Sequence, residues 1–153
     1  MRKRFIYSLA FVSALFTIAA CNDDDEKPAS LLGGWQGDKV EASVKVDGFP
    51  EPFVDNDEDF AGQAEFKSDG TVIFKEDGDI TEGTWAQNGN TLILMVDGLS
   101  EEDDISGSYA IKELNSSRLK IYIEKEAKFY DDESGIEFVG LLKATLYFNR
   151  KSF

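Results

Sequence analysis

The chain has 153 residues, with 16 lysines and arginines against 30 aspartates and glutamates, no histidine and a single cysteine. This length suits one domain with a real hydrophobic core. The excess of negative charge argues against binding to nucleic acid and against lying flat on anionic lipid. Without histidine or a spare cysteine there is no Ser-His or Cys-His nucleophile and no ordinary zinc site. We therefore expect a non-enzymatic protein that holds no metal and no cofactor.

Residues 1–20 have the composition of a secretory leader. Three basic residues at positions 2–4 precede an apolar run over residues 5–18, which is too short for a comfortable membrane span. Residues 18–21, Ile-Ala-Ala-Cys, resemble the lipobox of bacterial lipoproteins, which are cleaved before the cysteine and acylated on it. The resemblance implies that Cys21 is lipidated and anchors the protein to a membrane. Ordinary secretion, with Cys21 as a stray thiol, is the alternative.

Residues 21–30 are predicted to form a flexible tether. Their composition, acidic and then Lys-Pro-Ala-Ser, is typical of solvated, disordered chain. The acidic run also resembles the signal that sends some Gram-negative lipoproteins to the cell surface. We therefore expect an outer-membrane lipoprotein, either exposed on the surface or facing the periplasm. The residues of this candidate export signal are Asp23, Asp24, Asp25 and Glu26.

Residues 31–153 alternate between apolar and polar side chains, as β-strands do, and no segment favours a helix. Eight antiparallel strands in a meander leave two free edges unless they close. We therefore predict an all-β, eight-stranded antiparallel up-and-down barrel, with a two-sheet β-sandwich as the alternative. A membrane-spanning barrel is disfavoured, because Lys120, Glu124 and Lys128 would face lipid. The predicted strands are Trp35–Val46, Gln63–Lys67, Thr71–Glu76, Ile80–Gln87, Thr91–Val96, Ser106–Leu114, Arg118–Tyr130 and Ile136–Arg150.

Turn sequences predict how neighbouring strands pair. Ser-Asp-Gly at residues 68–70 suits a three-residue loop that ends in a left-handed glycine, and Asn-Gly at residues 88–89 suits a two-residue turn. For the last two strands, the predicted pairing sets large apolar side chains opposite large or small ones. These choices pair Phe66 with Val72, Trp85 with Leu92, and Phe129 with Ile136.

Three short motifs suggest a family. Leu-Gly-Gly-Trp at residues 32–35, Phe-Lys-Ser-Asp-Gly-Thr at residues 66–71, and Gly-Thr-Trp followed by Asn-Gly-Asn within residues 83–90 together resemble lipocalin-like domains of small bacterial lipoproteins. The resemblance extends from residue 31 to the C-terminus and implies a lipocalin-like barrel.

The same resemblance implies how one end of the barrel closes. In lipocalins a Gly-x-Trp opens the first strand, and an arginine on the last strand packs over the tryptophan. Gly33, Trp35 and Arg150 occupy the matching positions here. The usual Thr-Asp-Tyr motif and the helix after the barrel are absent.

Two functions from different classes follow from such a barrel. One is a binding module that holds a small apolar or amphiphilic molecule. The other is an interaction protein whose barrel is filled by its own side chains and whose surface contacts a protein partner. Eight strands are compatible with either outcome. Candidate cavity-lining residues are Phe66, Phe74, Trp85, Tyr109, Ile121 and Phe138.

The long predicted connections are acidic and should meet at the end opposite Trp35. Residues 48–62, 77–79, 98–105 and 130–135 hold fourteen acidic side chains and no lysine or arginine. We therefore predict an acidic mouth that attracts a cationic amphiphile, a divalent ion or a basic protein. An EF-hand is excluded because Phe60 stands where the loop requires glycine, while a looser calcium site and a plain acidic loop both remain open. The candidate rim residues are Asp55, Asp57, Asp59, Glu101, Glu102, Asp103, Asp104, Asp131 and Asp132.

Overall fold

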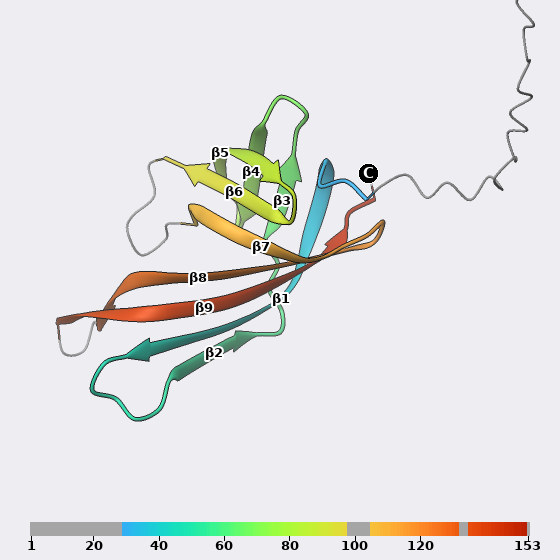
Figure 1. Ribbon diagram of the computed structural model, residues 1–153. Coiled ribbons are helices and arrows are strands. Elements are labelled where there is room, and N and C mark those ends of the chain that lie inside the picture. The colour runs from blue at the N-terminus through green and yellow to red at the C-terminus, as the bar shows by residue number, and fades with distance from the viewer. Residues whose placement is uncertain (1–28, 98–104, 132–134, 153) are drawn as a thin grey trace, which may run out of the picture.

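The structure is a computed structural model that describes residues 29–97, 105–131 and 135–152. These residues form an all-β fold, and none of them belongs to a helix long and apolar enough to cross a membrane. Figure 1 shows the strands in their places around the barrel. The strands are β1 (Gly33–Val46), β2 (Phe53–Asp57), β3 (Gln63–Phe66), β4 (Thr71–Glu76), β5 (Asp79–Asn88), β6 (Thr91–Val96), β7 (Gly107–Leu114), β8 (Arg118–Asp131) and β9 (Ile136–Arg150).

The predicted eight-stranded antiparallel barrel is confirmed. From β3 to β9 each strand pairs with the next one along the chain, and β1 closes the barrel by pairing with both β3 and β9. The eight predicted strands end within two residues of their predicted limits. Alternation builds the core locally, as in β6, where Leu92, Leu94 and Val96 are buried while Ile93 and Met95 point outward.

Strand β2 is an addition that the sequence analysis did not predict. Residues 53–57 were expected to lie in a loop, but they pair with Val40–Val44 of β1. This is the same side of β1 to which β3 binds at Gly33–Gln36. Strand β1 is longer than β3, so its outer half offers a free edge that β2 occupies. Chain segment 48–62 is therefore partly strand, which corrects the prediction of one long connection.

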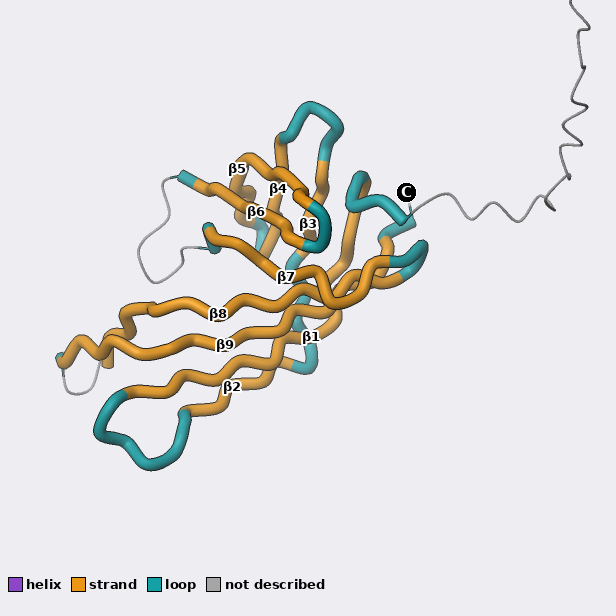
Figure 2. The backbone as a smooth tube through the Cα atoms, viewed as in Figure 1, coloured by secondary structure: helices purple, strands orange, loops and turns teal. Residues whose placement is uncertain are grey.

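Long and short strands divide the barrel into two parts (Figure 2). We call β2, β1, β9 and β8 the long sheet, and β3 to β7 the short sheet. The two sheets join only near one end, where residues 33–36 of β1 pair with β3 and residues 110–114 of β7 pair with β8. Beyond these ladders the two sheets diverge, and the long sheet projects past the short one (Figure 1). The barrel thus has a closed end and an open end.

The two hairpin predictions had different outcomes. The loop at residues 68–70 pairs Phe66 with Val72, as predicted, and Gly70 has a φ of 86°. The next hairpin was predicted wrongly, because Trp85 lies opposite Leu94 instead of Leu92. Asn88 pairs with Thr91, so the turn consists of residues 89–90, with a positive φ at Gly89, as in a type II′ turn.

The pairing of the last two strands was also predicted wrongly by two residues. Phe129 lies opposite Phe138, and Ile136 lies opposite Asp131. A shift of two residues keeps every side chain on its face of the sheet, so the apolar face was still predicted correctly. The two strands are joined by a shorter connection than was predicted, because β8 continues through Asp131.

The outer face of the long sheet carries a network of charged and aromatic side chains. Tyr147 on β9 lies between Lys39 of β1 and Lys120 of β8, whose ammonium groups are 4.6 and 4.8 Å from the centre of its ring. The Tyr147 hydroxyl donates a hydrogen bond of 2.7 Å to Glu41, which also accepts one of 2.8 Å from Lys39. The hydrogen bond from Lys39 is the main reason that the pKa of Glu41 is lowered. This face is therefore built to contact water.

Candidate functional site

The closed end of the barrel is sealed by Trp35. Its side chain has no exposed area, and its indole N–H donates a 2.8 Å hydrogen bond to the carbonyl of Leu31. The Arg150 guanidinium lies 3.9 Å from the centre of the Trp35 ring and donates hydrogen bonds to the carbonyls of Ser30 and Leu32, each 2.7 Å long. Partial burial lowers the pKa of Arg150, which remains charged at neutral pH. The segment before β1 and the end of β9 are thus held together over the closed end of the barrel.

Gly33 takes part in the same arrangement. Its φ is 104°, a conformation that residues with a Cβ rarely adopt, and an added Cβ would come within 3.3 Å of the Arg150 guanidinium. The structure therefore brings together Gly33, Trp35 and Arg150, the three residues that the sequence suggested for closure of the barrel.

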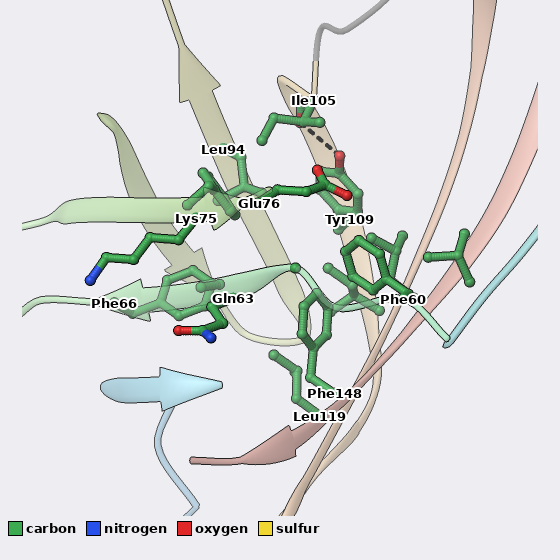
Figure 3. Close-up of a pocket in the computed structure, with 16 residues that line it drawn as sticks. Phe60, Gln63, Phe66, Lys75, Glu76, Leu94, Ile105, Tyr109, Leu119 and Phe148 are labelled. Carbon is green, nitrogen blue, oxygen red and sulfur yellow. Dashed lines mark hydrogen bonds between the residues drawn. The ribbon is translucent and has the colours of Figure 1, made fainter. Parts of the chain in front are cut away.

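An inner chamber of about 180 Å³ lies inside the barrel beyond this seal (Figure 3). Apolar side chains line most of it, and Gln63, Lys75 and Glu76 are the polar residues at its margin. The hydroxyl of Tyr109 donates a 2.7 Å hydrogen bond to the carbonyl of Ile105, so the tyrosine contributes its ring to the wall (Figure 3). The apolar and aromatic residues of the wall include Val40, Phe60, Phe66, Phe74, Leu94, Ile105, Tyr109, Leu119, Ile121, Leu146 and Phe148.

Phe60 is a wall residue that the sequence pattern did not predict. It follows β2 in an acidic segment, yet its ring packs edge-on against Phe148, with 5.9 Å between ring centres. Two glycines make room for the ring, since a Cβ on Gly37 or Gly62 would come within 2.5 Å of it. The Gly37 N–H also donates a 2.6 Å hydrogen bond to the Gly62 carbonyl. A lone phenylalanine flanked by Gly62 was the only sequence signal for this role.

The inner chamber opens into a wider mouth of about 620 Å³, with which it shares wall residues such as Val40 and Tyr109. On the long sheet the mouth is lined by apolar side chains, among them Leu142 and Ala144. On the short sheet it is lined by Phe74 and Tyr109 and by the hairpin that joins β4 to β5. The mouth is therefore apolar along most of the long sheet, where Lys125 is the charged residue, and its polar wall is the β4–β5 hairpin.

Three carboxylates belong to the polar wall. Glu76 and Asp79 pair at the end of the hairpin, and Asp77 and Gly78 form its turn, with φ values of 49° and 93°. A positive φ at both positions is the pattern of a type I′ turn, which the Asp-Gly sequence favours. The mouth is lined by one lysine, Lys125, whose ammonium donates a 3.2 Å hydrogen bond to the carbonyl of Ser106. Near the mouth the described charges are thus mainly negative.

The predicted lining residues divide into two groups. Phe66, Phe74, Tyr109 and Ile121 line the chamber, whereas Trp85 and Phe138 do not. Trp85 packs edge-on against Phe66 near the closed end, with ring centres 5.3 Å apart, and donates a hydrogen bond to the Lys67 carbonyl. Phe138 lies on the projecting part of the long sheet, next to Phe49.

The predicted acidic rim is described only in part. Asp55 and Asp57 lie on β2 opposite Ala42 and Val40, and so on the same face as the apolar wall. Asp59 donates its N–H to the Asp57 carboxylate in the turn that follows. Cys21, the residues of the export signal, Glu101 to Asp104, Asp132 and the side chain of Asp131 lie outside the described part of the structure. Whether these residues act as predicted stays a prediction.

The described residues contain no group of three Asp, Glu, His or Cys side chains placed to hold a metal ion. Within the same residues, each fully buried side-chain nitrogen or oxygen has a hydrogen-bond partner. The wall of the chamber thus presents apolar surface and no strained polar group. Its chemistry is that of a site that shelters an apolar group from water.

Comparison with known families agrees with this geometry. A profile of the lipocalin-like domain matches residues 31–121, more than half of the chain. The chain belongs to this lipocalin-like family. No curated protein and no solved structure matches it. The matched part of the lipocalin-like domain ends within β8, so most of β8 and all of β9, two of the four strands of the long sheet, lie beyond it.

Proposed function

We propose that this lipocalin-like protein is a non-catalytic binding module for a small cationic amphiphile. The apolar part of the ligand enters the inner chamber, and its cationic group lies in the mouth beside Glu76, Asp77 and Asp79. The proposal rests on the arrangement of the inner chamber and the mouth along the barrel. An apolar chamber, sealed at one end by Trp35, opens at the other end onto these three carboxylates and Lys125.

The sizes of the two spaces limit the shape of the ligand. An apolar cavity of roughly 150 Å³ holds one molecule the size of benzene. The chamber of about 180 Å³ therefore accepts one ring or a short alkyl segment. The mouth of about 620 Å³ is within the usual range for small-molecule sites, so it accommodates the larger part of the ligand. Opposite charge in the mouth steers a cation toward the chamber.

The proposal includes a lipid anchor on Cys21. Arg150 fastens Ser30 and Leu32 to the closed end, so the tether leaves the barrel on the side away from the mouth. The ten residues from Cys21 to Ser30 span at most about 35 Å when extended. An anchored chain would thus hold its closed end toward the membrane and its mouth toward the aqueous phase. The residues of the candidate export signal would place it on the outer face of the outer membrane.

Binding is tested by calorimetry on residues 21–153 carrying Cys21→Ser, which prevents lipidation. A decyl ammonium and a decyl sulfate are compared at low and high salt. We expect the cation to bind more tightly, and we expect added salt to weaken it, because salt screens exposed charges. The triple variant Glu76→Gln, Asp77→Asn, Asp79→Asn should lose this preference. Glu82→Gln, on the outer face of β5, is the matched control. Equal binding of both amphiphiles, or binding of neither, would reject the proposal.

Anchoring is tested in cells. Cys21→Ala should release the protein from the membrane fraction, because the anchor is the acyl chains of that residue. Replacement of Asp23, Asp24, Asp25 and Glu26 by alanine should leave lipidation intact and reduce cleavage by a protease added to whole cells. Unchanged cleavage would remove the export signal from the proposal and leave a periplasmic anchor.

The alternative function, a filled barrel that contacts a protein partner, accounts for only half of the molecule. Side chains do fill the closed end, where Leu31, Trp35 and Leu119 have almost no exposed area. They leave the chamber and mouth open. The open half therefore favours a ligand over a purely structural barrel.

A further inference from the structure

Apolar side chains continue beyond the mouth along the inner face of the long sheet. We call Val44, Val46, Phe49, Phe53 and Phe138 the outer strip. Phe49 contacts both other aromatic rings, with 5.4 Å to the ring centre of Phe53 and 6.1 Å to that of Phe138. The three rings thus form one cluster, which lies outside the inner chamber.

The outer strip is continuous with the wall of the mouth. Val44 pairs directly with Leu142, which lines the mouth, and also with Phe53 on its other side. Val46 pairs with Gly140 of β9. Because Gly140 has no side chain, the side chains of Val44 and Val46 occupy the space next to its Cα. From Leu142 to Phe138 the strip extends about 13 Å along β9.

The aromatic part of the strip is open to solvent. Phe49 is 44% exposed and Phe53 is 55% exposed. Exposed aromatic side chains that contact one another form a patch of the kind that marks binding surfaces. On the same face, Asp55 follows Phe53 along β2, and Lys125 pairs with Leu142 on the other flank. Charged groups thus border the strip near the mouth, while its centre is apolar.

The site therefore has three zones in series: the apolar inner chamber, the mouth with its acidic β4–β5 hairpin, and the apolar outer strip. A ligand with one apolar part and a cationic head at the mouth would leave the strip unused. Building on the proposed function, we propose that the ligand is a two-armed cationic amphiphile. One apolar arm enters the inner chamber, the cationic centre lies at the mouth, and the second arm lies on the outer strip.

The test measures the affinity of residues 21–153 carrying Cys21→Ser for three quaternary ammonium ions by calorimetry, below their micelle concentrations. Decyltrimethylammonium has one arm, didecyldimethylammonium has two, and hexadecyltrimethylammonium has one long arm. If the second arm lies on the strip, the two-armed ion should bind at least about tenfold more tightly than the one-armed decyl ion. Hexadecyltrimethylammonium, with its single long arm, should show much less of this increase in affinity.

Variants assign the gain to the strip. Phe53→Ser and Phe49→Ser should remove most of it and leave decyltrimethylammonium within about twofold of its original affinity. Val54→Ser is the matched control, since Val54 is 65% exposed on the opposite face of the same strand and should leave all three affinities unchanged. Because the three side chains are exposed, thermal unfolding should show that each variant is folded.

Several results would overturn the proposal. Equal affinity for one and two decyl arms would show that the strip holds no arm, although cation binding would still support the proposed function. If the two-armed ion keeps its higher affinity in both phenylalanine variants, the second arm does not bind the outer strip, and the strip would instead be a surface for a protein partner. A dimer in sedimentation that Phe53→Ser dissociates would assign the strip to a second copy of the chain. If none of the three ions binds, the proposed function fails together with this inference.

Discussion

The closed and open ends of the barrel differ in how completely their strands pair. At the closed end the strands pair all the way round, and Trp35 is buried under Arg150 and Leu31. At the open end the long sheet extends alone and leaves Phe49 and Phe53 exposed. One end therefore supplies most of the packing, and the other is free to keep apolar surface in contact with water. Stability and binding are separated along the barrel axis.

The largest expected effect is the contrast in stability between the two ends. Trp35→Ala removes a fully buried indole and leaves a cavity, so it should lower the free energy of unfolding by about 3–5 kcal/mol. Phe53→Ala removes a half-exposed ring and should cost less than about 1 kcal/mol. Urea unfolding of both variants measures the difference. Similar losses would show that the open end also holds the fold together.

A second substitution should weaken binding by obstructing the mouth. Ala144 lines the mouth between Ile123 and Ala42, so the larger side chain of Ala144→Phe should block the passage to the chamber. We expect about tenfold weaker binding of decyltrimethylammonium, since much of its apolar contact is lost. Thr145→Phe, on the outer face of β9, is the control. Full affinity in the Ala144 variant would mean that the ligand binds elsewhere.

The cation–π contact should give a smaller, coupled effect. Arg150→Ala should cost about 0.5–2 kcal/mol, and less in a Trp35→Ala background, because the guanidinium lies directly over the indole. Part of the loss should persist in that background, because Arg150 also binds the carbonyls of Ser30 and Leu32. Strictly additive losses in this double-mutant cycle would contradict the contact.

The smallest effect concerns pH. The pKa of Glu41 is lowered in the folded protein, chiefly by the hydrogen bond from Lys39, so ionised Glu41 stabilises the fold at neutral pH. That contribution is lost as the pH falls below about 4.5 and through the lowered pKa. Glu41→Gln should therefore be slightly less stable than the original protein at pH 7 and equal to it in acid. The loss from Trp35→Ala should not change with pH in this way. A difference for Glu41→Gln that stays constant in acid would refute its assignment to this carboxylate.

Much of the fold could be predicted because alternation and turn chemistry are local. The Ser-Asp-Gly loop specified the pairing of Phe66 with Val72, since a three-residue loop that ends in a left-handed glycine keeps the apolar side chains of both strands on one face. The contact of Arg150 with Trp35 followed from the family resemblance and from the meander, which brings both chain ends to one side. Asn88-Gly89 was less decisive, because an Asn-Gly-Asn sequence fits turns at two neighbouring positions.

The open end was harder to predict because it depends on unequal strand lengths. Residues 53–57, with two aspartates and a preceding proline, resemble a loop, and they become a strand only because β1 extends beyond β3. Phe60 lies in an acidic segment, and its ring reaches the chamber wall only because Gly37 and Gly62 leave room for it. Trp85 and Phe138 were correctly placed on the inner face, but they lie too far toward the two ends to reach the chamber.

By itself, the sequence determined eight strands, the face of each of them that is buried, the closure at Trp35 and the lipocalin-like family. These depend on side-chain alternation, turn residues and short motifs, which act over a few neighbouring residues. Only the tertiary structure decided the registers of two hairpins, the added strand β2, the chamber and the outer strip. Each of these depends on how far one strand extends past another, and that length is set by packing across the whole barrel.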